Sequence, residues 1–167
     1  MALLIRPGQV EDIDQINQIL NHYITNTAII FDIEAWSFDQ RQQWFKQYNS
    51  DLYHLLVAVD QDEMIGLVYN SGFMNKPAYN ISSEVSVYLN SKHNTVGQGI
   101  ASRLYTTLFD MIDQSQIHRL YARITLPNLA SINLHQKFGF LKVGTLDETG
   151  YKFGSYHSVD IYQKKLN

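Results

Sequence analysis

The segment EVSVYLNSKHNTVGQGIASRLY, residues 84–105, constrains the fold more than any other stretch of the chain. Its first six residues are typical of a β-strand, and the residues from Gly99 onward have the apolar spacing of a helix. Gly97 and Gly99 stand between the two elements. A helix N-terminus carries unpaired backbone N–H groups and a partial positive charge, and glycines before it let an anion approach the backbone closely. The segment therefore predicts either a phosphate-binding loop or a tight turn.

Two common phosphate-binding patterns do not fit this loop. A P-loop places Lys and then Ser or Thr after its last glycine, whereas Ile100 and Ala101 follow here. A dinucleotide-binding unit needs G-x-G-x-x-G and an acidic residue about 20 positions later. This chain has Ser102 at the third glycine position and no acid in HRLYARI, residues 118–124. Both of these nucleotide-binding functions are therefore only weakly indicated.

Strand and helix patterns alternate along the rest of the chain. Residues 10–23 have apolar positions at helical spacing, and Ser37 with Gln40 predicts a capping box at the start of a second helix. Two more helix patterns cover about 99–115 and 129–139. Strand patterns lie at 3–8, 53–60, 64–73, 82–89, 119–126, 140–148 and 156–166. This order predicts one α/β domain over residues 1–167, with helices on the faces of a mixed sheet.

Composition excludes several classes of function. The 167 residues carry a formal net charge of -3 and no run of Lys and Arg, so a nucleic-acid surface is not indicated. The absence of cysteine excludes disulfides, thiolate metal sites and a cysteine nucleophile, and we expect no metal cofactor. No stretch approaches the roughly 18 apolar residues of a membrane span, and the N-terminus lacks the apolar stretch of a signal peptide. We therefore expect a cytoplasmic protein that binds neither nucleic acid nor membranes.

Two motifs together resemble those of the Gcn5-related N-acetyltransferases, the GNAT superfamily. They are the loop VGQGIA, residues 96–101, and the downstream segment NLASINLHQKFGF, residues 128–140. The loop keeps its second half but has Val96 where the superfamily has Arg or Gln. Four segments that span nearly the whole chain are similar to the phosphinothricin and methionine sulfoximine N-acetyltransferase subfamily: NHYITNTAIIFD, PAYNISSEVSVYL, ASINLHQKFGF and YKFGSYHSVD.

The resemblance implies the GNAT fold, whose mostly antiparallel sheet splays between the catalytic strand and the next, parallel strand. It implies transfer of an acetyl group from acetyl-CoA to the α-amine of a small amino-acid analogue, such as phosphinothricin, methionine sulfoximine or methionine sulfone. It also implies a homodimer. Two alternatives remain open, namely acetylation of a protein N-terminus or lysine, and a catalytically silent sensor that binds coenzyme A.

Glu84 and His135 are the candidate catalytic residues. Much of an α-amine is protonated at neutral pH, so a base helps its attack on a thioester, and Glu84 stands where the subfamily has a Glu. The other interpretation of Glu84 is a solvent-facing strand residue or an ion-pair partner. By the same resemblance, His135 protonates the departing thiolate, since imidazole can donate a proton at neutral pH. The other interpretation of His135 is a surface histidine.

The resemblance assigns coenzyme binding to the glycine loop, the strand before it and two residues downstream. The splayed strand is expected to pair with the pantetheine arm as an added strand would, and the backbone N–H of Val87 is expected to bind the developing oxyanion. Asn128 is expected to hydrogen-bond the coenzyme arm, although it also suits a helix cap. The predicted coenzyme residues are Val87, Tyr88, Leu89, Gly97, Gln98, Gly99, Ile100, Ala101, Ser102, Asn128 and Lys137.

The expected acceptor pocket is where this chain departs from the subfamily. The segment FMNKPAYN, residues 73–80, has Met74, Lys76 and Asn80 where the subfamily often has Arg. A carboxylate is held best by a bidentate Arg, so Lys76 is a weaker candidate for this contact. The other interpretation of the segment is a variable surface loop. The predicted acceptor residues are Phe31, Met74, Asn75, Lys76, Glu84, Val85 and Ser86.

Overall fold

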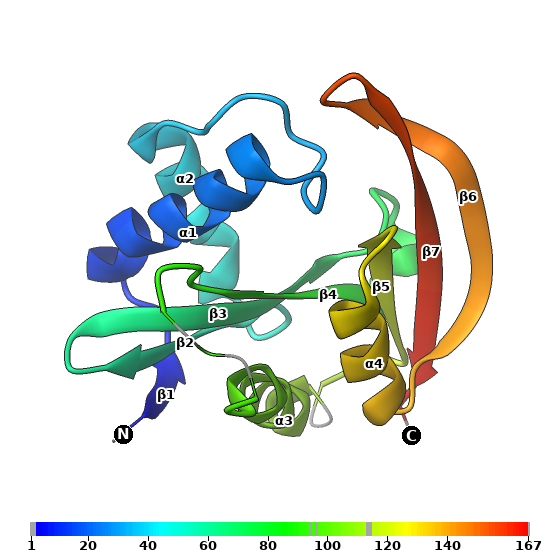
Figure 1. Cartoon of the computed structure of the whole chain (residues 1–167). Coiled ribbons are helices and arrows are strands. Elements are labelled where there is room, and N and C mark those ends of the chain that lie inside the picture. Colours follow the sequence, from blue (N-terminus) through cyan, green and yellow to red (C-terminus); the bar gives the residue numbers. More distant parts are fainter. Residues whose placement is uncertain (1–2, 94, 96, 113–114, 167) are drawn as a thin grey trace.

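A seven-stranded sheet forms the centre of the computed structural model, which describes residues 3–93, 95, 97–112 and 115–166 (Figure 1). The strand order is β1-β2-β3-β4-β5-β7-β6, and only β4 and β5 are parallel neighbours among these described strands. The strands are β1 (Leu4–Pro7), β2 (Leu55–Asp60), β3 (Glu63–Gly72), β4 (Ser82–Leu89), β5 (Arg119–Thr125), β6 (Leu141–Lys152) and β7 (Ser155–Lys165). The predicted α/β class with a mostly antiparallel mixed sheet is confirmed.

Helices cover both faces of this sheet (Figure 1). On one face, Ile16 of the first helix and Phe45 of the second join a core with β2 and β3. On the other face, Leu104 and Leu108 of the third helix join a core with β4 and β5. The helices are α1 (Ile13–Asn26), α2 (Phe38–Phe45), α3 (Ile100–Ile112) and α4 (Leu129–Lys137), with 3-10 turns at Val10–Asp12, Lys46–Asn49 and Pro77–Tyr79.

Local sequence patterns explain where these helices begin. In α1 the buried side chains recur every three or four positions, so one apolar stripe faces the sheet. α2 begins with the predicted capping box, in which Ser37 Oγ accepts from the Gln40 N–H and Gln40 Oε1 accepts from the Ser37 N–H. α3 begins at Ile100, one residue after the predicted start.

β4 separates from β5 partway along its length. The parallel pairing covers three positions, the last of which sets Glu84 opposite Tyr121. β4 nevertheless stays paired with β3 as far as Leu89, and β5 stays paired with β7 as far as Thr125. Because each strand follows its other neighbour, the edge of β4 beyond Glu84 faces a gap. The splay that the resemblance implied is therefore present.

The C-terminal hairpin of β6 and β7 is longer than the strand patterns predict. The prediction ends its first strand at residue 148, whereas β6 continues to Lys152 with shifts in its pairing register. The far end of the hairpin lies against the last turns of α1 and the segment that follows it. There the Lys152 ammonium donates hydrogen bonds to the carbonyls of Ile24 and Ile30, at 2.5 and 2.6 Å. These contacts hold the segment after α1 beside the region where β4 and β5 separate.

Candidate active site

Two cavities meet where β4 and β5 separate, and each has a size that suits a small molecule. The first, of about 400 Å³, reaches α4 and is here called the α4 cavity. It is lined by Tyr23, Ile29, Val85, Ser86, Val87, Tyr88, Leu89, Ala101, Tyr105, Ala122, Arg123, Ile124, Thr125, Asn128, Ala130, Ser131, Leu134 and His135. The second, of about 430 Å³, reaches β6 and β7 and is called the hairpin cavity. It is lined by Ile29, Ile30, Phe31, Trp44, Tyr69, Ser71, Glu84, Ser86, Tyr88, Arg123, Thr125, Leu146, Thr149 and Val159.

The two cavities share a boundary at the open edge of β4. The residues that line both are Ile29, Ser86, Tyr88, Arg123 and Thr125. The two predicted catalytic residues lie on opposite sides of this boundary, since Glu84 lines the hairpin cavity and His135 lines the α4 cavity. Molecules bound in the two cavities would therefore meet beside the open strand.

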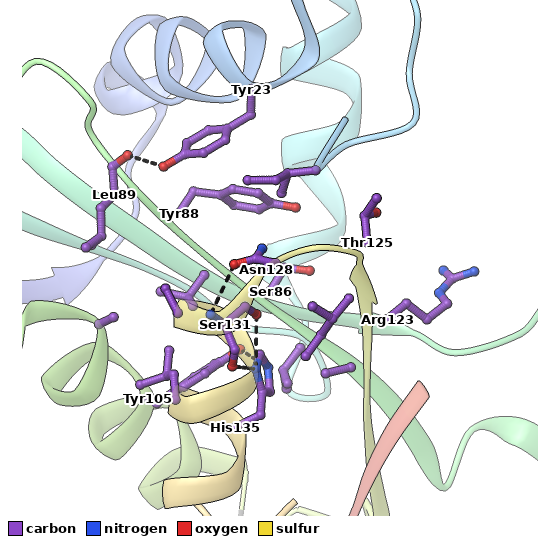
Figure 2. A pocket seen from close by; sticks show the side chains of 18 residues that line it. Tyr23, Ser86, Tyr88, Leu89, Tyr105, Arg123, Thr125, Asn128, Ser131 and His135 are labelled. Carbon is purple, nitrogen blue, oxygen red and sulfur yellow. Dashed lines mark hydrogen bonds between the residues drawn. The ribbon is translucent and has the colours of Figure 1, made fainter. Parts of the chain in front are cut away.

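Backbone groups of the open edge face the gap between β4 and β5. The Asn90 N–H donates to the Ile65 carbonyl on the β3 side, so strand alternation turns the N–H and C=O groups of Leu89 and Val87 the other way. The Leu89 carbonyl accepts a hydrogen bond from the Tyr23 hydroxyl at 2.8 Å (Figure 2). The Val87 N–H points to the same side of the strand, which is the orientation that its predicted role requires.

His135 lies inside the α4 cavity, with only 3% of its surface exposed (Figure 2). Nδ1 lies 2.7 Å from the Ser131 carbonyl and is therefore assigned the proton, and Nε2 accepts from the Tyr105 hydroxyl at 2.8 Å. Burial lowers the pKa of His135, and the contact with Ser131 opposes this effect. The interpretation of His135 as a surface histidine is wrong, and its role as a proton donor stays a prediction.

The glycine loop adopts a backbone conformation that favours glycine. Gly97 and Gly99 have φ angles of +75° and +70°. A Cβ added at either residue would meet no described atom within 4 Å. Glycine is therefore favoured here by the backbone conformation and not by a lack of space. Beside this loop, the Lys137 ammonium donates to Ser102 Oγ at 3.0 Å, which links α4 to the first turn of α3. Val96 lies outside the described residues.

The predicted coenzyme residues fall into two groups. Those that line the α4 cavity are Val87, Tyr88, Leu89, Ala101 and Asn128. Those outside its lining, around the N-terminus of α3, are Gly97, Gln98, Gly99, Ile100, Ser102 and Lys137. Ile100 differs from the rest, because its side chain is buried in the core beneath α3. Asn128 is also the N-cap of α4, where its side-chain oxygen accepts from the Ser131 N–H at 3.1 Å, so the helix-cap interpretation is confirmed.

Glu84 pairs with Arg123 in the hairpin cavity. The guanidinium holds both carboxylate oxygens, with Nε donating to Oε1 at 2.8 Å and Nη2 donating to Oε2 at 2.5 Å. The Glu84 side chain is 13% exposed, whereas the Arg123 side chain is 55% exposed. The hydrogen bond to Glu84 raises the pKa of Arg123. The ion-pair interpretation of Glu84 is confirmed, and its role as a base stays a prediction.

Two tyrosines beside Glu84 supply no competing base. Tyr69 and Tyr88 line the hairpin cavity, and their stacked rings have centroids 6.2 Å apart. Burial raises the pKa of both phenols, so both are protonated at neutral pH. Within the described lining of this cavity, Glu84 is the one carboxylate.

The predicted acceptor residues do not converge on Glu84. Phe31 and Ser86 line the hairpin cavity with it. Val85 is buried in the core beneath α3, on the opposite face of β4. A neighbouring hollow, which shares Trp44 and Ser71 with the hairpin cavity, is lined by Met74, Asn75 and Lys76. The structure thus does not bring these three residues into the cavity of Glu84, and their part in acceptor binding stays a prediction.

Sequence reasoning missed three residues of this site. Arg123, Tyr105 and Tyr23 line the α4 cavity, and each bonds a residue that was predicted. Arg123 carried a signal, because alternation in RLYARIT places it on the strand face opposite the buried Leu120 and Ala122. The two tyrosines carried none, because an aromatic residue on the apolar side of a helix is indistinguishable from ordinary core.

Groups that could hold a metal ion and helices that could cross a membrane are not found in the part of the chain that the structure describes. There, no group of three or more His, Asp and Glu side chains is arranged to hold a metal ion. None of the described helices is long and apolar enough to cross a bilayer.

The chain is similar over nearly its whole length to named N-acetyltransferases. A phosphinothricin N-acetyltransferase of Streptomyces coelicolor is 41% identical over 165 residues, which cover 97% of this chain and 95% of the relative. An L-methionine sulfoximine/L-methionine sulfone acetyltransferase of Salmonella typhimurium is 27% identical over 165 residues, which cover 99% of this chain and 95% of the relative.

Solved structures of acetyltransferases share the fold. A ribosomal-protein-alanine N-acetyltransferase from Brucella melitensis has a TM-score of 0.92 at 32% identity, covering 98% of this chain and 99% of its own. A GNAT superfamily phosphinothricin acetyltransferase from Sinorhizobium meliloti, in complex with acetyl-CoA, has a TM-score of 0.93 at 26% identity, covering 100% of this chain and 90% of its own. Residues 5–159 match the acetyltransferase (GNAT) domain family. The splayed sheet, the glycine loop and these similarities together place the chain in the GNAT acetyltransferase family, to which it belongs.

Proposed function

We propose that this protein transfers the acetyl group of acetyl-CoA to the α-amine of a small amino-acid analogue, of the phosphinothricin, methionine sulfoximine or methionine sulfone type. One observation carries the proposal: the cavity that contains Glu84 meets the α4 cavity at the open edge of β4. An acceptor beside Glu84 would thus adjoin a thioester bound along that edge. The names of the relatives support this acceptor class, and the Sinorhizobium complex supports the donor.

The α4 cavity and the glycine loop fit the donor. The open edge of β4 offers backbone N–H and C=O groups to a pantetheine arm, in the way that a sheet edge accepts an added strand. The Val87 N–H is the proposed donor to the thioester oxygen, because it faces the gap. The pyrophosphate is proposed to bind backbone N–H groups of residues 97–102, where two glycines precede α3.

Glu84 is the proposed base of the reaction. The acceptor ammonium gives a proton to the Glu84 carboxylate, and the neutral amine attacks the thioester carbonyl carbon. The carbonyl oxygen takes the negative charge and is stabilised by the Val87 N–H. When the tetrahedral intermediate collapses, the nitrogen gives its second proton to solvent water, the amide forms and the thiolate of coenzyme A departs. A proton taken up by the thiolate then balances the reaction.

The pair of Tyr105 and His135 is the proposed source of that last proton. Both residues line the α4 cavity and share a hydrogen bond of 2.8 Å. A tyrosine hydroxyl both donates and accepts, so Tyr105 can accept a proton from protonated His135 while it passes its own proton to the sulfur. Burial lowers the pKa of His135, so the protonated form is scarce at neutral pH. We therefore expect this proton transfer to contribute less to kcat than Glu84 does, because the thiolate of a thiol with a pKa of about 8.5 can also depart without being protonated.

The proposal extends to assembly and location. We expect residues 1–167 to act as one domain in the cytoplasm, where acetyl-CoA is available, without nucleic-acid or membrane partners. We also expect a homodimer. Three exposed aromatic residues at the end of the hairpin support this expectation, because aromatic side chains are enriched at protein interfaces. They are Tyr151, Phe153 and Tyr156.

A second candidate function is acetylation of a protein N-terminus, which the similarity to the Brucella enzyme favours. The hairpin cavity favours a small acceptor instead. Phe31 packs directly against Gly150, so closely that a side chain at Gly150 would overlap its ring. This contact joins the segment after α1 to the hairpin and closes one wall of the hairpin cavity, which Phe31 lines.

A thiol-release assay tests these functions against one another. Acetyl-CoA is supplied with a panel of free amino acids, the three analogues named above, and short peptides that begin with the same residues. We expect turnover with free amino-acid analogues and little with peptides. Turnover confined to peptides would support the second candidate, and acetyl-CoA binding without turnover of any acceptor would support a silent sensor.

A further inference from the structure

The guanidinium of Arg123 has donors that Glu84 does not use. Its Nε and one N–H of Nη2 donate to the two carboxylate oxygens of Glu84. Both N–H groups of Nη1 and the second one of Nη2 remain, in the planar arrangement that matches a carboxylate. No described residue accepts a hydrogen bond from Nη1. A second carboxylate-binding edge is therefore available on the same side chain.

This edge lies where an acceptor has to bind. Arg123 lines both cavities, and its side chain is 55% exposed although it is ion-paired. On β5 it stands two residues beyond Tyr121, the register partner of Glu84, and it shares that face of the strand. Figure 2 shows its guanidinium directed away from His135. Arg123 therefore lies at the boundary between the cavities, and its guanidinium is bound to Glu84 in the hairpin cavity.

Other cations are less well placed than Arg123. Lys76 lines the neighbouring hollow and is not part of the hairpin cavity lining. Lys152 donates to two backbone carbonyls under the hairpin. Arg41 is buried over the rings of two tryptophans and is not part of the cavity lining. Within the described lining of the hairpin cavity, Arg123 is the one cation.

We propose that Arg123 anchors the α-carboxylate of the acceptor through its Nη1–Nη2 edge while its Nε–Nη2 edge stays bound to Glu84. The inference rests on the function proposed above. The amine and carboxylate of an α-amino acid are attached to the same carbon, so a carboxylate anchored here brings the amine within reach of the proposed base. A bidentate contact also fixes the orientation of the acceptor. The site then selects free α-amino acids, because a peptide or an amide has no carboxylate at this position.

The test compares two acceptors that differ in this group alone, methionine sulfone and its primary carboxamide. For the wild type we expect kcat/KM to be about 10- to 100-fold higher for the carboxylate, the size expected for hydrogen bonds to a charged group. Arg123→Ala is expected to reduce this ratio to near unity, and Arg123→Lys to restore only part of it, since Lys lacks the planar fork. Arg119→Ala is the matched control, because Arg119 shares the strand face but lines neither cavity.

The ratio separates anchoring of the acceptor from positioning of Glu84. If Arg123 only positions Glu84, Arg123→Ala lowers turnover of both acceptors alike and the ratio persists, which would overturn the proposal. A ratio that collapses in Lys76→Ala but not in Arg123→Ala would assign the carboxylate to Lys76 instead. A collapse in Arg119→Ala would attribute the ratio to general positive charge on β5 and would also overturn the proposal.

If the wild type acetylates neither acceptor, the proposed function is rejected. Whether Arg123 binds the carboxylate is then tested by measuring binding in place of turnover. Calorimetry with the same two compounds then decides it. Binding that requires the carboxylate in the wild type but not in Arg123→Ala would support the anchor. Equal binding of the two compounds to the wild type would refute it.

Discussion

Replacing Glu84 with Gln distinguishes the proposed role of Glu84 as a base from its structural role in the ion pair with Arg123. The amide oxygen of Gln can still accept a hydrogen bond from Arg123 Nε. Its NH₂ group, however, would face Nη2 in place of Oε2, which lies 2.5 Å from Nη2. One charge-assisted hydrogen bond is then lost. Such a bond contributes about 1.5–3 kcal/mol, and the 55% exposure of Arg123 brings this toward the roughly 1 kcal/mol or less of surface pairs.

The Glu84→Gln protein is therefore expected to fold. A loss of about 1 kcal/mol is small against the roughly 5–15 kcal/mol of a typical domain, and it lowers Tm by only about 2–4 °C. Acetyl-CoA binding should persist, because Glu84 does not line the α4 cavity. The value of kcat should fall by roughly 10² or more, the usual contribution of a general base, which corresponds to about 2.7 kcal/mol of activation free energy.

The dependence on pH distinguishes the loss of a base from a general defect. Thiol release is measured for the wild type and Glu84→Gln from about pH 6 to about pH 9. The deficit should shrink as the pH approaches the pKa of the acceptor amine, because an amine that is already neutral needs no base. Near-wild-type turnover of the variant at about pH 6 would refute this reasoning and leave Glu84 as a structural partner of Arg123.

Gly99→Val should raise the KM for acetyl-CoA many-fold, because a β-branched residue resists a φ angle of +70° at the proposed pyrophosphate loop. An unchanged KM in a folded variant would reject that loop assignment. His135→Gln should weaken the dependence of stability on pH. Burial lowers the pKa of His135, so below the unfolded value of about 6.5 the unfolded chain binds more protons and the wild type loses stability as pH falls. Urea unfolding at about pH 7 and about pH 5 measures this effect, and equal changes in both proteins would contradict it. The protein should sediment as a homodimer at micromolar concentration, and a monomer would contradict the proposed assembly.

The elements that position the site follow from local patterns in the sequence. The apolar stripe of α1, the capping box at Ser37 and the strand at Ser82–Leu89 each depend on neighbours within a few residues, so the sequence predicts them well. The glycine loop is also local, because a positive φ at Gly99 is a property of one residue. The splay of β4 from β5 came from the resemblance alone. It depends on which neighbour each strand keeps, and no short pattern encodes that choice.

Contacts between distant residues make up the part that the sequence did not predict. Glu84 and Arg123 are 39 positions apart, and Lys152 reaches Ile24 across 128 positions. The extension of β6 was missed for a similar reason. The part that was missed, TGYK at residues 149–152, contains a glycine and a lysine, which disfavour a strand, and pairing with β7 overrides this local preference.

Under the proposal above, Arg123 takes over the binding of the acceptor carboxylate from the arginines that residues 73–80 lack. Met74, Lys76 and Asn80 leave the segment without the guanidinium that a carboxylate prefers, whereas Arg123 offers one from β5. A guanidinium on a strand, bonded on one edge to the base itself, holds the carboxylate and the amine of an acceptor at a spacing set by two neighbouring strands. Such pre-organisation places the reacting groups more accurately than a loop does. Selection of the acceptor and activation of its amine would then depend on one ion pair, so substitutions of Glu84 and Arg123 should not be additive.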